Sequence, residues 1–342
     1  MFGTGKLIRE TLRAGAPRSL EATRLVRQGR LLEATAAIQE RLGGPTLPTP
    51  PVTAPDPRAG GAGSSRATGT VTRGAAGGLA YRRYVPAGVG SGAPLLVMLH
   101  GGTQDADAFA ACTGMDQAAG RAGVVVVYPE QSRAANPMGY WNWFRPGDQA
   151  RDAGEPASIA AVVRAVASDQ HTDPARVAVA GFSAGGAMAA VMAAAYPDLF
   201  CGAGVHSGLP HGAAHDVGSA FAAMSTPPTV VADGGPVPLV VVHGDADRTV
   251  APGNGHAVVR SALTGAGRTE HRRATGRAGR AWTRDRWSEP GGRVLAESWT
   301  VHGMGHAWSG GPAGAAYADP AGPDAAAAML AFFGFTPGAG VG

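Results

Sequence analysis

Residues 177–190, VAVAGFSAGGAMAA, constrain the fold of this 342-residue chain more than any other stretch. A run of apolar residues leads directly into GFSAG at 181–185, and small residues that favour a helix follow. The run predicts a buried strand and the small residues predict a helix. A sharp strand-to-helix turn needs residues with almost no side chain two positions before and after its centre, and glycine supplies them. The sequence therefore predicts a G-x-S-x-G turn that raises the hydroxyl of Ser183 above the end of a strand.

Strand-like and helix-like segments alternate along most of the chain. Several apolar runs are continuous, which is typical of strands buried on both faces of a parallel sheet. Strands are expected at 81–85, 94–100, 124–130, 177–183, 202–208 and 238–245, a hairpin at 281–301, and helices at 106–123, 157–169, directly after 183, and at 324–335. This order predicts an α/β fold with a mostly parallel central sheet and helices on both faces.

A serine hydroxyl is a poor nucleophile unless a base accepts its proton and a carboxylate orients that base. In chains with this turn, the partners follow in the order Ser, Asp or Glu, His. HGDADRTV at 243–250 matches the pattern H-G-x-x-D-x-x-V of α/β-hydrolases, so Asp247 is the expected carboxylate and Asp245 the alternative. The expected base is His306, in GMGHAW, and the alternative is His302.

Two backbone N–H groups are needed to stabilise the negative oxygen that forms during acyl transfer. One is expected at Ala184, directly after the serine, and the other at Gly102, in the turn that follows a buried strand. His100 and His243 lie at or near the ends of two of the expected strands, and we expect them to support the neighbouring loops by hydrogen bonding.

Two weaker signals lie in loops. Trp141 and Trp143 belong to a polar loop and are interpreted either as the lining of an acyl or aromatic pocket or as simple packing residues. His211 and His215 have the i, i+4 spacing of a metal site, but no Glu follows as in zinc hydrolases. Neither a metal nor a cofactor is therefore expected.

The part of the chain that holds these residues, 67–337, is predicted to be one catalytic domain. Residues 1–44 are predicted to form a basic helical hairpin, and residues 45–66 a Pro/Gly-rich linker. A single hairpin cannot bury its own apolar face. We expect it to dock on its own domain, on a second subunit or on a granule surface.

The balance of charge argues against a nucleic-acid partner. Of 29 Lys and Arg and 25 Asp and Glu, residues 1–45 hold eight and four, so the remainder carries 21 of each sign. Nucleic-acid binders present a basic surface with aromatic side chains, and residues 1–45 contain neither Trp nor Tyr.

The sequence shows neither an apolar run before a small-residue cleavage site nor a run of about 20 apolar residues. Two cysteines, Cys112 and Cys201, are too few for a disulfide framework and are expected to be buried thiols. A cytoplasmic location without a transmembrane segment is therefore expected.

Residues 95–306 resemble the poly(3-hydroxyalkanoate) depolymerase-like esterases of the α/β-hydrolase superfamily. The resemblance rests on LHGGTQDADAFA, VVVVYPEQSRAANPMGYWNWF, RDAGEPASI, VAGFSAGGAMAAVMAAAYPDLF, VHSGL, HGDADRTV and GMGHAW. It implies ester hydrolysis through an acyl-enzyme, with Ser183, Asp247 and His306 at the triad positions of the family. It also implies that the substrate is a short-chain polyester, feruloyl or acetyl-sugar ester.

This chain departs from the family pattern at two positions. Gly102 and Tyr140 stand where many relatives carry two cysteines, which fits a reducing compartment, although many relatives are extracellular. The 36 residues after His306 are too few for an added polymer-binding domain, so a soluble or amorphous substrate is expected.

The expected function is hydrolysis of 3-hydroxybutyrate-type esters or oligomers. The alternatives are a feruloyl or acetyl-sugar esterase, a peptidase or amidase on the same fold, and a granule- or partner-binding protein with a vestigial site.

Overall fold

The computed structural model describes residues 69–336. The hairpin and the linker expected over 1–44 and 45–66 lie outside this part of the chain.

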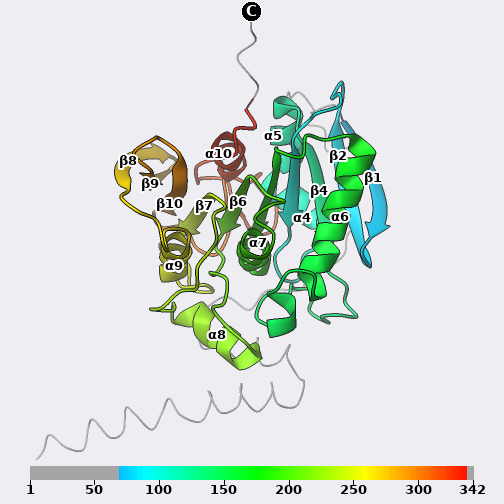
Figure 1. Cartoon of the computed structure of the whole chain (residues 1–342). Coiled ribbons are helices and arrows are strands. Elements are labelled where there is room, and N and C mark those ends of the chain that lie inside the picture. Colours follow the sequence, from blue (N-terminus) through cyan, green and yellow to red (C-terminus); the bar gives the residue numbers. More distant parts are fainter. Residues whose placement is uncertain (1–68, 337–342) are drawn as a thin grey trace, which may run out of the picture. The chain divides into compact units, whose positions relative to one another are not determined.

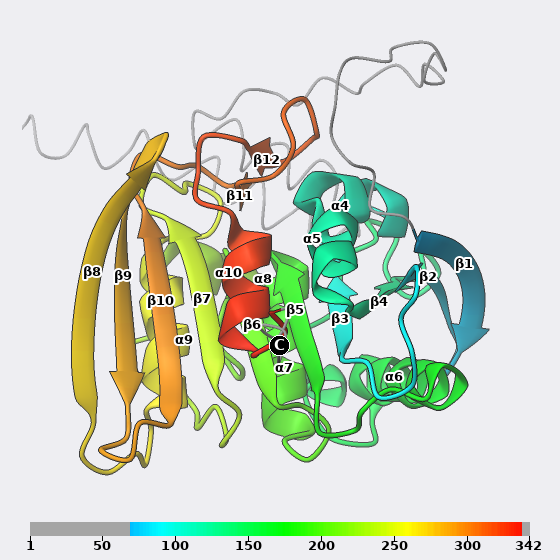
Figure 2. The ribbon, with the colours of Figure 1, turned by 90° about the horizontal axis from the view of Figure 1, so that it is seen from above.

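A ten-stranded sheet forms the centre of the described part (Figure 1). Its strands are β1 (Gly69–Ala76), β2 (Leu79–Pro86), β3 (Leu95–Leu99), β4 (Val125–Glu130), β5 (Val177–Phe182), β6 (Gly202–His206), β7 (Leu239–Gly244), β8 (Glu270–Ala278), β9 (Arg280–Ser288) and β10 (Val294–Val301). Their order is β1-β2-β4-β3-β5-β6-β7-β10-β9-β8, which Figure 2 shows from right to left. The strands from β4 to β10 in this order are parallel, and antiparallel strands flank them at both ends.

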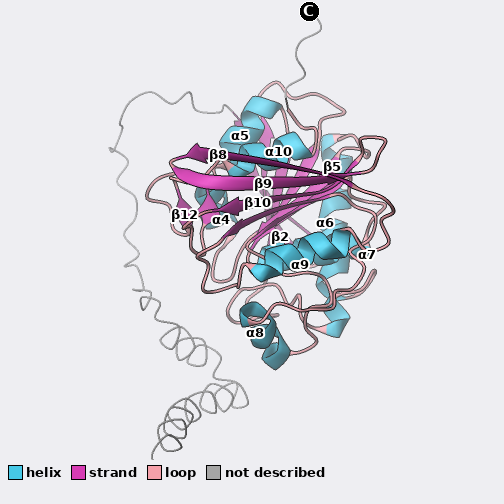
Figure 3. Cartoon of the chain, turned by 90° about the vertical axis from the view of Figure 1, so that its left-hand side faces the viewer, coloured by secondary structure: helices cyan, strands magenta, loops and turns pink. Residues whose placement is uncertain are grey.

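Helices cover both faces of the sheet. They are α4 (Ala106–Thr113), α5 (Met115–Ala122), α6 (Gly154–Gln170), α7 (Ala184–Ala195), α8 (Val217–Ser225), α9 (Gly253–Ala262) and α10 (Ala325–Phe332), with a 3-10 turn η1 (Pro146–Asp148) and a small pair of strands, β11 (Trp308–Ser309) and β12 (Ala318–Asp319). Figure 3 shows α5 and α10 on one side of the strands and α8 and α9 on the other. Within residues 69–336, none of the helices has the length and apolar character needed to cross a membrane.

The buried side chains form two hydrophobic clusters, one on each face. Along β3, Leu95, Val97 and Leu99 belong to the cluster that includes α6, α7 and α9. Leu96 and Met98 point the other way, into the cluster with α4, α5 and α10. Because successive side chains of a strand alternate between faces, a strand covered on both sides needs an uninterrupted apolar run. The predicted sheet, mostly parallel with helices on both faces, is confirmed.

Three details of the prediction were wrong. Cys201, which was expected to be a buried thiol like Cys112, is exposed. The single helix expected at 106–123 is two helices, because Gly114 has a φ of 62° and its N–H bonds the Ala110 carbonyl, which ends α4. The outer strands β1 and β8 were missed altogether. Their side chains are mostly exposed, so neither carries the apolar pattern by which the inner strands were found.

The turn between β5 and α7 has the close packing that the sequence predicts. Ser183 has φ 56° and ψ −118°, outside both strand and helix conformations. A Cβ atom on Gly185 would fall well inside contact distance of the Leu99 carbonyl oxygen on β3, and one on Gly181 would overlap the carbonyl of Gly185. The two glycines therefore allow the turn to pack directly against the neighbouring backbone.

We predict that Gly185→Ala lowers the free energy of unfolding by about 1–3 kcal/mol, because two backbone segments must separate to admit a methyl group. Urea unfolding measures the effect. Gly267→Ala is the matched control, since nothing lies within 4 Å of the added Cβ there. Equal stability of the two variants would contradict the packing described.

Candidate active site

Three side chains that are far apart in the sequence meet at one edge of the sheet. Ser183, Asp247 and His306 follow β5, β7 and β10, and the carboxyl ends of these parallel strands share one edge. His306 Nε2 lies 3.0 Å from Ser183 Oγ, and His306 Nδ1 lies 2.7 Å from Asp247 Oδ2. With Nδ1–H donating to the carboxylate, Nε2 is free to accept the serine proton. This is the geometry of an activated serine nucleophile.

Asp247 is buried but strongly hydrogen-bonded. Its Oδ1 accepts the backbone N–H groups of Thr249 and Val250, both at 2.9 Å. Burial by itself raises the pKa of Asp247, but hydrogen bonds and charge from His243 and His306 outweigh it and hold this pKa below its ordinary value. The side chain therefore stays a carboxylate, as orientation of an imidazole requires.

Asp245 and His302, the alternatives from the sequence, bind each other instead. His302 Nδ1 lies 2.7 Å from Asp245 Oδ2, and its Nε2 lies 2.9 Å from the hydroxyl of Thr283 on β9. Asp245 also accepts the N–H of Gly303 at 2.6 Å. This pair fastens the loop after β10 to the loop after β7 and so holds His306 beside Asp247.

His206 supports the same loop from beneath, and the sequence analysis gave it no role. Its ring is fully buried and stacks on Trp308 at a centroid distance of 4.7 Å. Its Nε2 accepts the backbone N–H of Ser309, three residues after His306. Burial, with the neighbouring His243 and His306, lowers the pKa of His206 well below its ordinary value. The ring must be neutral to accept this hydrogen bond. The position of His206 at the end of β6 is the signal by which the sequence could have indicated this supporting role.

The two expected backbone donors lie on elements next to Ser183. Ala184 is the first residue of α7, where the helix leaves its N–H groups unpaired and favours negative charge. In the turn after β3, Gly101 N–H donates to Gln104 Oε1 and Thr103 N–H donates to the Met138 carbonyl. Within residues 69–336, the N–H of Gly102 between them has no such acceptor.

His100 and His243 both hydrogen-bond to nearby backbone. His100 Nδ1 lies 2.8 Å from the Gly101 carbonyl, and its Nε2 accepts the N–H of Gln131. His243 Nε2 lies 3.0 Å from the Val250 carbonyl. Both imidazoles thus contact the loops that carry the candidate site residues.

The two tryptophans lie in the core. Trp141 is fully buried and Trp143 is 5% exposed, and both belong to the hydrophobic cluster that includes α6, α7 and α9. Trp141 packs against the ring of His100, with centroids 5.4 Å apart. This placement agrees with the packing interpretation, since neither ring offers an exposed surface. Tyr317, which the sequence analysis did not single out, is partly exposed, and its hydroxyl lies 3.5 Å from Thr103 Oγ1.

Glu155, at the start of α6, connects the loops that contain Gln131 and Asn142 by hydrogen bonds. It accepts hydrogen bonds from the side chain of Gln131 and from the backbone and side chain of Asn142. Burial raises the pKa of Glu155 to about 7, although these hydrogen bonds act in the opposite direction. Gln131 in turn donates its backbone N–H to His100, so the network reaches the strand end beside the site.

The histidine pair considered as a metal site is separated. His211 Nε2 lies 3.2 Å from the Gln149 carbonyl, whereas His215 is exposed and lies near Asp216. In the part of the chain that the structure describes, no three His, Cys, Asp or Glu side chains gather as metal ligands would.

Comparison with known proteins identifies the family. The family model described as Esterase PHB depolymerase matches residues 79–286, more than half of the chain. The chain belongs to this family. The resemblance found in the sequence is thereby confirmed.

The relatives of this chain include enzymes whose names refer to different ester substrates. Poly(3-hydroxyalkanoate) depolymerase C of Paucimonas lemoignei is 36% identical over 244 residues, which are 67% of this chain and 58% of the relative. Feruloyl esterase B of Neurospora crassa is 31% identical over 129 residues, 37% of this chain and 43% of the relative. The matches thus span about half the length of these relatives.

Among solved structures, an acetyl xylan esterase from Aspergillus awamori superimposes with a TM-score of 0.62 at 19% identity. The superposition covers 78% of this chain and all of the other. The predicted α/β-hydrolase fold is confirmed.

We predict that Glu155 makes stability fall as pH rises from about 5 to about 8. Its folded-state pKa lies above its ordinary value, so the folded protein binds this proton more tightly than the unfolded chain does. The resulting stabilisation is complete below the pKa of Glu155 in the unfolded chain and is lost as pH passes about 7. The free energy of unfolding should fall by about 2–3 kcal/mol between the two pH values.

Urea unfolding of the wild type and Glu155→Gln at both pH values isolates this contribution, because other titrating groups are shared. The wild type should lose stability relative to the variant as pH rises. If the difference in free energy of unfolding between the two proteins does not change with pH, the raised pKa of Glu155 is refuted.

Proposed function

We propose that this protein is a serine carboxylic-ester hydrolase that works through an acyl-enzyme. The observation that carries the proposal is the continuous hydrogen-bonded chain from Ser183 Oγ through His306 to Asp247. Membership of the PHB depolymerase esterase family supports it.

In the first half of the reaction, His306 Nε2 accepts the Ser183 proton while Oγ attacks the ester carbonyl carbon. Asp247 holds the imidazole in the tautomer with Nδ1–H and stabilises the cation that forms. The N–H groups of Gly102 and Ala184 donate to the negative oxygen, aided by the N-terminus of α7. His306 then gives the proton to the leaving alcohol, and an acyl-Ser183 ester remains.

In the second half, water takes the place of the alcohol. His306 accepts a proton from water as its oxygen attacks the acyl group, and returns it to Ser183 Oγ as the acid leaves. Each N–H of the oxyanion site typically contributes about 100- to 1,000-fold in rate.

The substrates under this proposal are short-chain polyhydroxyalkanoate esters or oligomers of the 3-hydroxybutyrate type. The support is the name of the Paucimonas lemoignei relative, whose match covers two thirds of this chain. Feruloyl or acetyl-sugar esters are the second candidate, favoured by the feruloyl esterase relative.

We predict that Ser183→Ala lowers the rate of ester hydrolysis at least about 1,000-fold, because no other group supplies the nucleophile. The assay offers hydroxybutyrate oligomers, feruloyl esters and acetylated sugars, and identifies the acid that is released. Release of 3-hydroxybutyrate is expected to be fastest.

Ser225→Ala, at an exposed serine in α8, is the matched control and should retain full activity. Circular dichroism establishes that both variants are folded. Comparable activity of Ser183→Ala and wild type would reject the mechanism, and equal turnover of matched amides would favour a peptidase or amidase.

We also predict that substitution of the two neighbouring aspartates lowers kcat to very different extents. Asp247→Asn should lower kcat about 10,000-fold, because an amide no longer holds the reactive tautomer of His306. Asp245→Asn should lower kcat at most about 100-fold, through displacement of the loop that carries His306. Steady-state kinetics on one ester substrate measures both, and the reverse order would make Asp245 the triad carboxylate.

A further inference from the structure

The turn after β3 carries one of the two proposed oxyanion donors, Gly102, which has no side chain to hold it in place. Its neighbours are anchored, because Gly101 N–H donates to Gln104 Oε1 and Thr103 N–H donates to the Met138 carbonyl. The N–H of Gly102 must nevertheless keep one direction, since a displacement of about 1 Å in an active site can lower the rate about 100-fold. Another contact is therefore needed to fix this residue.

Two aromatic rings pack against the turn. A Cβ atom added to Gly101 would lie 2.9 Å from Cδ1 of Phe182, the residue directly before Ser183. A Cβ atom added to Gly102 would lie 2.9 Å from Cδ1 of Tyr140. Both distances are shorter than the contact distance between carbon atoms, about 3.5–4.0 Å. Each ring thus lies directly on one glycine of the turn.

The contact between Tyr140 and Gly102 involves the base of the tyrosine side chain. The three atoms nearest to the added Cβ atom are Cδ1, Cβ and Cγ of Tyr140, which cannot swing away unless the backbone of Tyr140 moves. The φ of Gly102 lies outside the left-handed region, so its backbone conformation does not by itself require glycine. Exclusion of a side chain at position 102 therefore comes from Tyr140.

Hydrogen bonds and burial hold the backbone around Tyr140. Its carbonyl accepts the side-chain N–H of Gln131 at 3.2 Å. Two residues further along, Asn142 N–H donates to Glu155 Oε2 at 2.7 Å, and Trp141 between them is fully buried. A ring on backbone that is anchored in this way can define the position of the turn against which it packs.

We propose that Tyr140 is a positioning residue for the oxyanion site, because its ring, packed on Gly102, fixes the direction of the Gly102 N–H. The inference rests on the proposed ester hydrolysis. The ring acts through Gly102 and not on the substrate. Because this N–H binds an oxygen that becomes negative only in the transition state, loss of the ring affects kcat and not KM.

Steady-state kinetics of Tyr140→Ala and Tyr140→Phe on one soluble ester tests the proposal. Tyr140→Ala removes the ring and should lower kcat about 10- to 100-fold, with KM nearly unchanged. Tyr140→Phe keeps the ring and should keep kcat near that of the wild type. An alkyl trifluoromethyl ketone, which adds to a serine hydroxyl to form a tetrahedral oxyanion, should bind Tyr140→Ala more weakly by the same factor.

Gly102→Ala tests the same contact from its other partner. The added methyl group meets the ring of Tyr140 and should lower kcat about 10- to 100-fold in the wild-type background. In the Tyr140→Ala background the ring is absent, so the same substitution should cost about tenfold less. Equal costs in the two backgrounds would show that the ring and the glycine act independently, which would overturn the proposal.

Tyr81→Ala is the matched control for loss of a tyrosine ring. Tyr81 on β2 also packs on a glycine, because a Cβ atom added to Gly74 would overlap its ring. The strands β4 and β3 lie between β2 and β5 in the sheet, so this ring is remote from Ser183. Tyr81→Ala should lower the urea midpoint but leave kcat unchanged. Urea midpoints also establish that every variant is folded.

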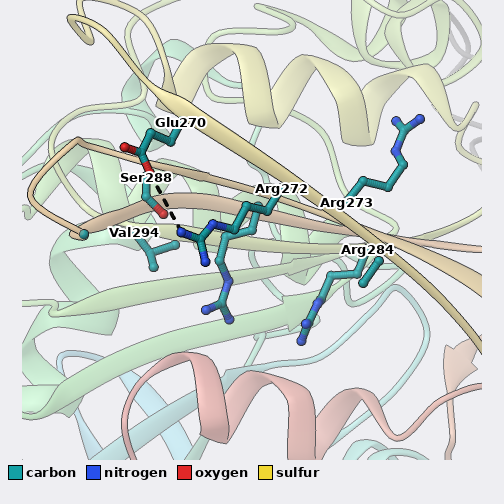
Figure 4. Close-up of a pocket in the computed structure, with 9 residues that line it drawn as sticks. Glu270, Arg272, Arg273, Arg284, Ser288 and Val294 are labelled. Carbon is teal, nitrogen blue, oxygen red and sulfur yellow. Dashed lines mark ion pairs between the residues drawn. The ribbon is translucent and has the colours of Figure 1, made fainter.

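A groove of about 430 Å³ on β8, β9 and β10 supplies a control on the surface (Figure 4). It reaches Ser288 at the end of β9, which pairs with Val294 at the start of β10, whereas the loop with His306 follows the other end of β10. Arg272 in this groove is 84% exposed. Arg272→Gln should therefore leave kcat unchanged.

Equal kcat of Tyr140→Ala and the wild type would overturn the proposal. So would a loss of kcat in Tyr140→Phe as large as in Tyr140→Ala, or a loss of this size in either control, since the effect would then not belong to the ring on Gly102. Failure of the proposed ester hydrolysis is recognised separately, because the wild-type protein would then release no acid from any ester.

Discussion

The backbone of Ser183 lies in a conformation that neither a strand nor a helix adopts, and close packing against β3 holds it there. Gly181 and Gly185 make this possible because their lack of a side chain lets three backbone segments touch. One consequence is that the hydroxyl stands above the sheet edge. Another is that Ala184 N–H, at the start of α7, lies beside it. The proposed nucleophile and one proposed oxyanion donor thus arise from a single packing constraint.

Buried histidines near the ends of the strands hold the loops of the candidate site in place. His100, His206 and His243 each lie within one residue of the end of a strand, and each hydrogen-bonds to the backbone of a loop at the site. Burial lowers the pKa values of His100 and His206, which favours their neutral rings. These two rings therefore position loops by hydrogen bonding without adding charge next to His306.

Two buried carboxyl groups near the site differ in pKa for a clear reason. Burial raises the pKa of both Asp247 and Glu155. Asp247 faces two imidazoles, which donate hydrogen bonds and can carry positive charge, so its pKa falls below the ordinary value. Glu155 is hydrogen-bonded by neutral amides and has Asp148 nearby, so burial prevails. One group stays charged for orientation of the base, and the other titrates near neutral pH.

Local patterns in the sequence were enough to predict the inner strands, the strand-turn-helix at Ser183 and the identity of Asp247 and His306 as candidates. Apolar runs and glycine spacing are short-range signals, so they can be read without knowing what packs against them. The tertiary structure alone decided between neighbouring residues: Asp247 and His306 reach Ser183, whereas Asp245 and His302 pair with each other. Which of these residues meet depends on differences of a few ångströms in the positions of loops that lie 59 residues apart in the sequence.

Other features had no local signal at all. The edge strands β1 and β8 lack an apolar pattern because water covers most of their side chains. The hydrogen bonds of Glu155 and the packing of Tyr140 on Gly102 follow from contacts between distant segments. The sequence by itself determined the fold class and the chemistry available to this protein, since both depend on residue type and spacing. Strand register and loop packing decided which side chains meet, since only the folded chain brings them within hydrogen-bonding distance.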